Sequence, residues 1–191
     1  MRKEPQQARS RKTRARLMAA LDSLLREKEF DHITVTEIAK TAGVSSGLLY
    51  SHFTNKSDFL EALLNAYKGS LLTRREEVEQ GDVREEFLEC GNLRDALRLI
   101  AGFAYDQLQD DAHIILAVSN FLRSRSDAEW LEWQDLRKRA FQTIAPVIDV
   151  FEDEVQRPNT AETAEMIVYF FNTIYLEIIM FRRRDHSSAP D

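Results

Sequence analysis

The most informative stretch of the chain is the polar segment GVSSGLLYSHFTNK, residues 43–56. It sets hydroxyl, imidazole and ammonium side chains around only four apolar residues. Such groups donate hydrogen bonds to phosphate oxygens and to acceptors on the edges of bases. They suit a surface that meets a polyanion better than they suit the core of a domain.

An enzyme would need a different set of residues. No serine and aspartate stand around His52 at a spacing that indicates a catalytic triad, and His32, His113 and His186 are scattered along the chain. Cys90 has no partner histidine at a recognisable spacing, and no glycine-rich loop follows a strand. We therefore expect no catalytic site, no bound metal and no cofactor.

Charge is unevenly distributed along the chain. Residues 1–56 carry 11 Lys and Arg against 6 Asp and Glu, whereas residues 57–191 carry 15 against 26. Because Lys and Arg that neutralise phosphates release condensed counterions, the basic end favours a polyanionic partner. The basic cluster there, taken alone, is more simply explained as a solvated tail or helix face. It consists of Arg9, Arg11, Lys12, Arg14 and Arg16.

Helix signals surround the polar segment. Apolar residues at helical spacing between Arg9 and Lys28 predict a first amphipathic helix, which the sequence EKEFDHI ends. Thr34 and Glu37 have the spacing of a capping box, which predicts the start of a short second helix. Gly43 can adopt the positive φ that a sharp turn after this helix requires.

A third helix is expected to follow this turn, with Ser45 as its cap. Leu49 and Phe53 lie one turn apart and should face inward, which leaves a polar face pointing outward. That face includes Gly47, Leu48, Tyr50 and Ser51. Two short helices joined by such a turn form a helix-turn-helix, whose second helix can enter the major groove of DNA.

The segment TVTEIAKTAGVSSGLLYSHFTNKSDFLEALL, Thr34 to Leu64, resembles the DNA-binding signature of the TetR family of transcriptional regulators, with G-V-S-x-G-x-L-Y-x-H-F in order. The resemblance covers about the first third of the chain. It implies an all-α homodimer of about nine helices per chain, with a three-helix DNA-binding domain in residues 1–56. Residues 57–191 would form a helical domain for dimerisation and ligand binding. The resemblance favours a repressor, released when a ligand shifts the fourth helix and changes the separation of the two recognition helices.

The resemblance also implies which residues contact DNA. Phosphate contacts would come from the start of the second helix, from the start of the third, where free amides favour anions, and from polar side chains beyond it. Base edges would be read by Ser46, Leu48 and Ser51. The implied DNA-binding residues are Thr36, Ser45, Ser46, Gly47, Leu48, Tyr50, Ser51, His52 and Lys56.

Some of these assignments have simpler alternatives. Thr36 could do no more than solvate the start of its helix, and Ser45 could act as an ordinary cap, which is compatible with phosphate binding. Leu48 departs from the family, which more often has a small or hydroxylated residue at this position. Leu48 could pack on a thymine methyl group or cover the edge of the first helix, and the sequence favours neither.

The remainder of the chain predicts five or six further helices, with ends near residues 79–82, 89–92, 109–111, 123–127 and 156–160. A ligand pocket is apolar with a few placed polar groups, so polar and aromatic residues on these helices are candidates to line one. Core packing is the simpler explanation of each. The candidates are Phe103, Tyr105, His113, Phe121, Phe141, Asn172 and Tyr175, and they suit an apolar or aromatic effector of unknown identity.

The final helices are expected to form a homodimer. A helix over about Thr160–Arg184 is apolar on nearly every side, and such a helix must be buried nearly all round. One face can pack on the chain's own core and another on a second copy, beside a preceding helix over about Asp127–Val155. The alternative is a central helix in a monomer. The expected interface residues are Ile167, Phe170, Phe171, Ile174 and Ile178.

Two further features indicate a cytoplasmic protein. No apolar segment follows the basic N-terminus, and the single cysteine can form no internal disulfide. The apolar stretch Met166–Phe181 is shorter than the ~20 residues that span a bilayer, and Asn172 and Glu177 interrupt it. The expected partners are therefore double-stranded operator DNA, a small-molecule effector and a second copy of the chain, with no membrane.

Overall fold

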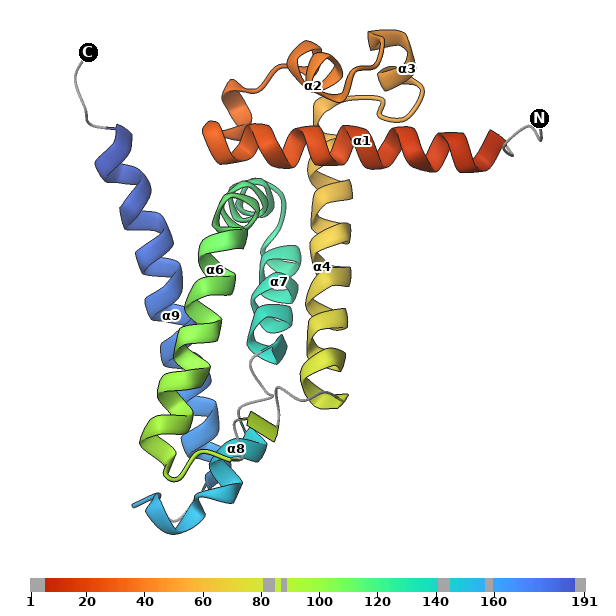
Figure 1. Cartoon of the computed structure of the whole chain (residues 1–191). Helices are drawn as coiled ribbons and strands as arrows, with labels where there is room; N and C mark the ends of the chain where they lie inside the picture. Colours follow the sequence, from red (N-terminus) through yellow and green to blue (C-terminus); the bar gives the residue numbers. More distant parts are fainter. Residues whose placement is uncertain (1–5, 81–84, 87–88, 141–144, 157–159, 188–191) are drawn as a thin grey trace. The chain divides into compact units, whose positions relative to one another are not determined.

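A computed structural model describes residues 6–80, 85–86, 89–140, 145–156 and 160–187 of the 191-residue chain. Within these ranges the regular structure consists of eight α-helices and two short 3₁₀ helices, with no strand, so the predicted all-α class is confirmed (Figure 1). The elements are α1 (Gln6–Glu27), η1 (Phe30–His32), α2 (Val35–Ala42), α3 (Ser46–Tyr50), α4 (Lys56–Gln80), α6 (Leu93–Arg123), α7 (Asp127–Ala140), α8 (Ala145–Val150), η3 (Glu152–Glu154) and α9 (Thr160–Ser187).

The chain divides into two compact units that do not follow the order of the sequence. The first unit combines the residues up to Tyr67 with His113–Ser124, and the second combines Lys68–Ala112 with the residues from Arg125 onward. Two helices therefore contribute to both units: α4 passes from one to the other after Tyr67, and α6 after Ala112.

The core of the first unit begins with one stripe of α1. Leu17, Leu21 and Leu25 recur every four residues and are 1% exposed or less, because they face the short helices that follow. In Figure 1, α2 and α3 lie on the same side of α1. Phe53 and Phe59 stack with ring centroids 3.9 Å apart and close this core where α4 begins.

The predicted capping box starts α2. Thr34 Oγ1 accepts a hydrogen bond from the Glu37 backbone N–H at 3.2 Å, and the Thr34 N–H donates to Glu37 Oε2 at 2.7 Å. Lys28 Nζ donates to the other carboxylate oxygen at 2.5 Å. These bonds lower the pKa of Glu37 to about 2, and the bond from Lys28 has the largest effect. The carboxylate therefore stays charged in mildly acidic solution.

The turn after α2 confirms the role predicted for Gly43. Its φ of 63° is left-handed, and its N–H donates to Ala39 and Lys40 carbonyls, which ends the helix. Arg16 reaches this turn from α1: its Nη2 donates to the carbonyls of Ala42 at 2.5 Å and Gly43 at 3.1 Å. A guanidinium at the carbonyl end of a helix also complements the negative end of the dipole.

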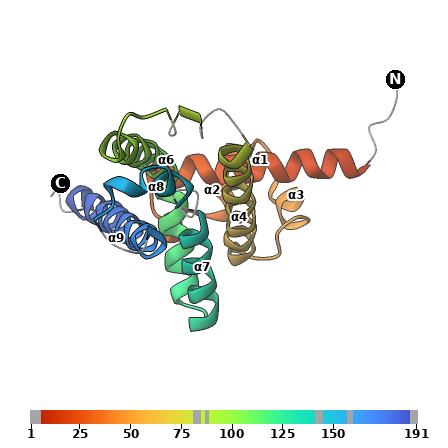
Figure 2. The same cartoon turned by 90° about the horizontal axis from the view of Figure 1, so that it is seen from below.

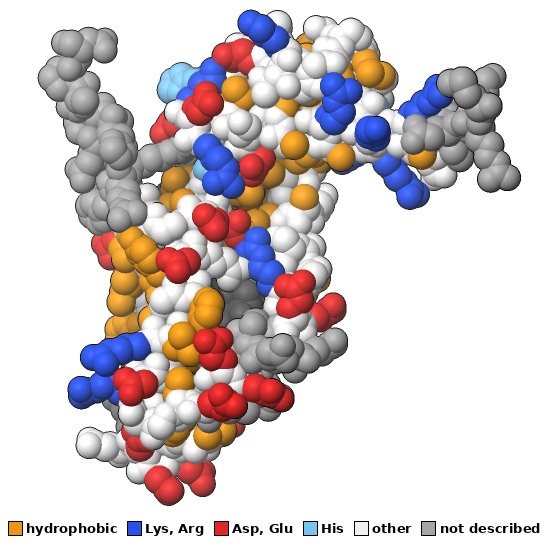
Figure 3. Space-filling model, in the orientation of Figure 1, with side chains coloured by type: hydrophobic (Ala, Val, Ile, Leu, Met, Phe, Trp, Pro, Cys, Tyr) orange, Lys and Arg blue, Asp and Glu red, His pale blue; other side chains and the backbone are white. Residues whose placement is uncertain are grey.

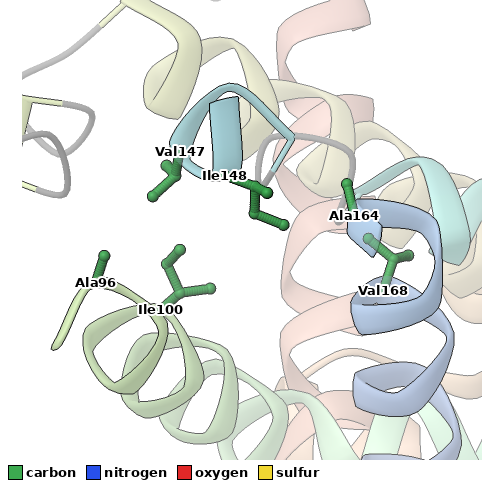
Figure 4. Close-up of a cluster of buried hydrophobic side chains, with 6 residues drawn as sticks. All are labelled: Ala96, Ile100, Val147, Ile148, Ala164 and Val168. Atoms are coloured by element: carbon green, nitrogen blue, oxygen red, sulfur yellow. The ribbon is translucent and has the colours of Figure 1, made fainter. Parts of the chain in front are cut away.

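The second unit has a core of its own, in which α6, α8 and α9 meet (Figure 4). Its six buried side chains are Ala96, Ile100, Val147, Ile148, Ala164 and Val168. Polar pairs join other helices of this unit. Lys68 of α4 binds Glu132 of α7 at 2.7 Å, and Arg74 of α4 binds Asp111 of α6 at 2.5 Å.

The predicted helix end at residues 109–111 is wrong, because α6 runs unbroken through them. The acidic sequence there looks like a loop, but Asp111 is only 8% exposed and its carboxylate is neutralised by Arg74. Leu108 and Ile115 are buried on either side of it and continue the apolar face of the helix. An ion pair with another helix thus compensates the charge of a carboxylate that the continuous helix places at a nearly buried position.

The single helix predicted over about Asp127–Val155 is also wrong. In the described residues this span contains α7, which ends at Ala140, then α8 and the 3₁₀ turn η3. Pro146 is the second residue of α8, where the missing N–H of proline leaves no helical bond unmade. In the interior of a longer helix the same residue would remove a hydrogen bond and clash with the preceding turn.

We predict that Gly43→Ala destabilises the protein by about 1–2 kcal/mol, because an L-residue is strained in the left-handed region. The added Cβ would also lie 2.9 Å from Arg16 Nη2 and disturb its bonds to the turn. Urea unfolding measures the effect. Gly69→Ala is the matched control: Gly69 lies inside α4 with nothing within 4 Å of the added carbon, so that variant should be stabilised by about 0.5–1 kcal/mol. Equal stability of Gly43→Ala and wild type would contradict the prediction.

Candidate nucleic-acid interface

The five residues of α3 separate a buried side from an open one. Leu49 is fully buried and Phe53, just beyond the helix, is 2% exposed, which confirms that both face inward. Leu48 is 42% exposed and Tyr50 is 56% exposed. Ser46, Gly47 and Ser51 are exposed as well. The first unit therefore presents a mostly polar helical face that its own core does not use.

Local hydrogen bonds fix the ends of this short helix. Ser45 Oγ accepts from the Leu48 backbone N–H at 3.2 Å, so Ser45 is the predicted N-cap. Ser51 Oγ donates to the Leu48 carbonyl at 2.7 Å. Thr36 is the second residue of α2 and is exposed. These contacts hold the hydroxyl groups at defined positions on the surface of the unit.

Lys56 and His52 are half-buried. Lys56 Nζ donates to the Asp31 carbonyl at 3.1 Å and lies 4.5 Å from the centre of the Phe30 ring, so it ties η1 to the start of α4. An ammonium group carries three donors, so this bond leaves capacity for an anion.

The exposure of Leu48 bears on its two alternative roles. At 42% exposure its side chain is not sealed against α1, although neighbouring Leu49 is fully enclosed. An apolar side chain left open on a polar face is available for contact with another apolar group, such as a methyl group in a groove of DNA.

Sequence reasoning missed two features that position the interface. The first is the contact of Arg16 with the α2–α3 turn, which spans 26 residues and has no local sequence signal. The second is the cap of α4: the Asp58 N–H donates to Asn55 Oδ1 at 3.1 Å, while Asp58 Oδ2 accepts from the Thr54 N–H at 2.7 Å. The spacing N-x-x-D could have revealed this cap as T-x-x-E revealed that of α2.

The basic cluster of α1 is divided between two kinds of position. Arg16 binds the turn, and the Arg14 guanidinium carbon lies 4.9 Å from the centre of the Phe53 ring, a cation–π contact. Arg9, Arg11 and Lys12 are exposed. On the face drawn in Figure 3, Lys and Arg side chains gather along the N-terminal half of α1.

The predicted pocket residues are distributed over both units. His113 and Phe121 belong to the first unit, and there His113 Nε2 lies 2.8 Å from Asp22 Oδ1. Phe103, Tyr105, Asn172 and Tyr175 belong to the second unit. Phe141 lies outside the described residues. The pocket therefore stays a prediction.

In the second unit, Tyr175 is the centre of a cluster of aromatic side chains. Its ring stacks on Phe171 at a centroid distance of 5.6 Å and lies 6.3 Å from Tyr105. Its hydroxyl donates to the Ala101 carbonyl at 2.7 Å, and burial, with Tyr105 second, raises the pKa of this phenol. Asn172 Nδ2 donates to the Val168 carbonyl at 3.4 Å. The Tyr175 and Asn172 side chains thus both have partners within the protein.

The predicted dimer residues of α9 differ in exposure. Ile167 and Phe171 are half-buried against the core of the second unit, and Ile178 is half-buried. Phe170 and Ile174 are 51% and 49% exposed, and their neighbour Tyr169 is 64% exposed. Figure 3 shows hydrophobic side chains along this helix.

Two other kinds of site were sought in the described part of the chain. No helix there has the length and apolar character needed to span a membrane. Within the same residues, no group of three or more His, Cys, Asp and Glu side chains is placed to hold a metal ion.

Comparison with known proteins bears on the first unit most directly. Residues 17–63 match a family described as bacterial regulatory proteins, tetR family. The nucleoid occlusion factor SlmA of Marinomonas sp. (strain MWYL1) is 32% identical over 91 residues, which cover 48% of this chain and 44% of that protein. The fatty acid metabolism regulator protein of Bacillus subtilis (strain 168) is 27% identical over 113 residues, covering 58% of this chain and 54% of that one. The chain thus spans about half the length of the curated relatives it matches.

Comparison of folds extends over more of the chain. The crystal structure of the transcriptional regulator FadR from Bacillus subtilis in complex with stearoyl-CoA aligns with 88% of each chain at a TM-score of 0.57 and 19% identity. That likeness shows a shared all-helical fold. The family match over residues 17–63 and the helix-turn-helix geometry of these residues together show that this region of the chain belongs to the tetR family of bacterial regulatory proteins.

Proposed function

We propose that the protein is a DNA-binding transcriptional regulator, and that it acts as a homodimeric repressor released by a small, largely apolar or aromatic ligand. One observation carries the proposal: α3 turns one side into the core and leaves a mostly polar side open. In a helix-turn-helix, this open side is the one that enters the major groove.

The residues of the first unit have complementary roles in this proposal. Ser46, Leu48 and Ser51 lie on or beside α3, where they would meet base edges. Tyr50 and Lys56 would hold phosphates. The complete proposed DNA-binding set is Thr36, Ser45, Ser46, Gly47, Leu48, Tyr50, Ser51, His52 and Lys56.

The charge distribution supports the same partner. Residues 1–56 carry a net charge of +5, from 11 basic and 6 acidic side chains, whereas the whole chain carries −6. The net negative charge of residues 57–191 disfavours indiscriminate binding to polyanions. The net positive charge of residues 1–56 would therefore orient the protein as it approaches DNA. We propose residues 1–56 as the DNA-binding domain and residues 57–191 as the domain for ligand and dimer.

The ligand proposal rests on the cluster of aromatic side chains around Tyr175 in the second unit. Apolar and aromatic side chains favour an apolar ligand. Bacillus subtilis FadR, which shares the fold, was solved with stearoyl-CoA, so long-chain acyl thioesters are a rational first class to test. Such a ligand can act only if it binds two conformations of the protein with different affinity.

Helix α4 is the element that we propose the ligand shifts. In the second unit it is held to α6 by Arg74 and Asp111, and to α7 by Lys68 and Glu132. Asp111 is 8% exposed, so parting it from Arg74 would leave a desolvated charge, which makes this pair the more important of the two. Glu132 is well exposed, and a solvated pair contributes little.

Selection of bound duplexes from a random pool tests the function. A regulator should enrich one palindromic sequence, bind it less tightly as salt rises, and release it when an acyl-CoA or another apolar ligand is added. If no sequence is enriched and binding is insensitive to salt, the chain is an interaction protein of packed helices instead of a DNA-binding regulator.

We predict that Tyr50→Phe and Leu48→Ala affect binding in different ways. Loss of a phosphate contact by Tyr50→Phe should weaken binding to all sequences alike and leave the dependence of log K on log salt nearly unchanged, because the lost hydroxyl carries no charge. Loss of a base contact by Leu48→Ala should relax the preference at one base pair, by about 1–3 kcal/mol. Gel shifts with single-base variants of the selected site measure both effects. An unchanged base preference of Leu48→Ala would rule out the thymine-methyl contact.

We also predict that α9 forms the dimer, because Phe170 and Ile174 are open to solvent on a helix whose other side is buried. Ile174→Asp, alone or with Phe170→Asp, should give a folded monomer that binds the selected site much more weakly, since one half-site replaces two. Ile178→Asp should likewise favour the monomer and weaken binding. Sedimentation velocity measures the state. Leu72→Asp, which alters a 53% exposed leucine on α4, is the matched control and should remain dimeric. A wild-type monomer at micromolar concentration would refute the proposal.

A further inference from the structure

Two arginines of the α1 cluster are already used inside the first unit. Arg16 binds the carbonyls at the end of α2, and Arg14 lies over the Phe53 ring. Both therefore have a role in holding the helix-turn-helix together. The basic residues nearer the start of α1 need a separate explanation.

Arg9 and Lys12 are exposed, and no hydrogen bond or ion pair between described residues holds either of them. They precede Arg16 by seven and four residues, so the three side chains lie within about 60° of one another around the helix axis. Arg9 and Lys12 thus extend, toward the start of α1, the same stripe whose last member reaches the α2–α3 turn. At ~1.5 Å of rise per residue, the stripe continues for about 10 Å beyond Arg16.

The local physics of the helix opposes this arrangement. The start of a helix is the positive end of its dipole, and α1 has no acidic residue in its first turn. Arg9 and Lys12 are three residues apart, and Lys12 and Arg16 four, so each pair repels. No acidic residue stands between Gln6 and Leu21 to relieve these charges. A basic stripe that costs helix stability is best accounted for by an anion outside the chain.

The position of the stripe indicates which anion. In both Figure 1 and Figure 2, the N-terminal turns of α1 project past α3, within the same unit. Cations beside a recognition helix, on a segment that overhangs it, would lie along the phosphate backbone and not in the groove.

We propose that Arg9 and Lys12 form a second phosphate-binding surface, which contacts the backbone of the same DNA duplex beside the part that α3 enters. This inference rests on the proposed DNA-binding function of α3. It adds a contact outside the helix-turn-helix that fixes the orientation of the protein on the duplex and contributes no base preference.

The test uses the full-length chain and a duplex that the wild type has selected from a random pool. Arg9→Gln and Lys12→Gln should each reduce the slope of log K against log salt by about 0.9 per chain. The double variant should reduce this slope by about 2 per chain. Ethylation interference should show phosphates that matter to the wild type and no longer matter to the double variant. The base preference of the selected site should stay the same.

Arg11→Gln is the matched control, because it makes the same chemical change two residues from Arg9 but about 160° away around the helix. It should keep the wild-type slope and interference pattern. Arg9→Lys with Lys12→Arg, which keeps both charges, should also keep the slope. Glutamine is a good helix former and relieves the repulsion along the stripe, so a melting temperature of the double variant at or above that of the wild type excludes loss of the fold.

The outcomes separate this inference from the function on which it rests. A wild type that selects a sequence, with a double variant of the same salt slope and the same interference pattern, overturns the second surface alone. An Arg11→Gln effect equal to that of Arg9→Gln overturns it too, since the effect would then come from net charge and not from the stripe. A wild type that binds no duplex overturns both.

Discussion

The α2–α3 turn, joined to α1 by Arg16, is the contact on which the geometry of the first unit depends. One guanidinium group donates to the last carbonyl of α2, that of Ala42, and to the carbonyl of Gly43, where the chain reverses. Those carbonyls have no partner within their own helix, and they lie at the negative end of its dipole. A positive side chain from a separate helix satisfies both needs. This contact thereby fixes the direction in which α3 leaves the turn relative to the axis of α1.

In the second unit, too, side-chain hydrogen bonds connect segments that are distant in sequence. Arg74 and Asp111 are 37 residues apart and Tyr175 and Ala101 are 74 apart, yet each pair is bonded. The bonds differ in strength because their surroundings differ. A nearly buried carboxylate or a buried phenol loses much if its partner leaves, whereas the exposed pair of Lys68 and Glu132 is already solvated.

What the sequence could predict follows from the range of each interaction. The cap of α2, the left-handed Gly43, the cap of α3 and the inward Leu49 are set by residues within a few positions of one another, and the structure has all four. Asp111 pairs with Arg74, which is far away in the chain, so local polarity at residues 109–111 predicts a break where the helix continues.

Other gaps in the prediction have similar causes. Arg16 looked like one of five similar cations, because nothing in the sequence tells which of them reaches a carbonyl. Pro146 is a local signal for a helix start, and it marks the beginning of α8 inside the span for which a single helix is predicted. The ligand site depends on how helices of the second unit pack, and spacing within a helix does not determine that.

The discontinuous make-up of the first unit has a consequence for how the protein is made. Its last segment, His113–Ser124, is separated from Tyr67 by the 45 residues of the second unit that come between them. At ~5–20 residues per second, a ribosome needs roughly 2 to 9 seconds to synthesise that interval. During this time α1 to α3 are complete but lack Ile115, Val118 and Leu122, which are buried in the finished unit, and Asp22 lacks His113. The nascent chain therefore passes through a stage in which apolar surface is exposed, when chaperone binding or interruption of translation would act on it most strongly.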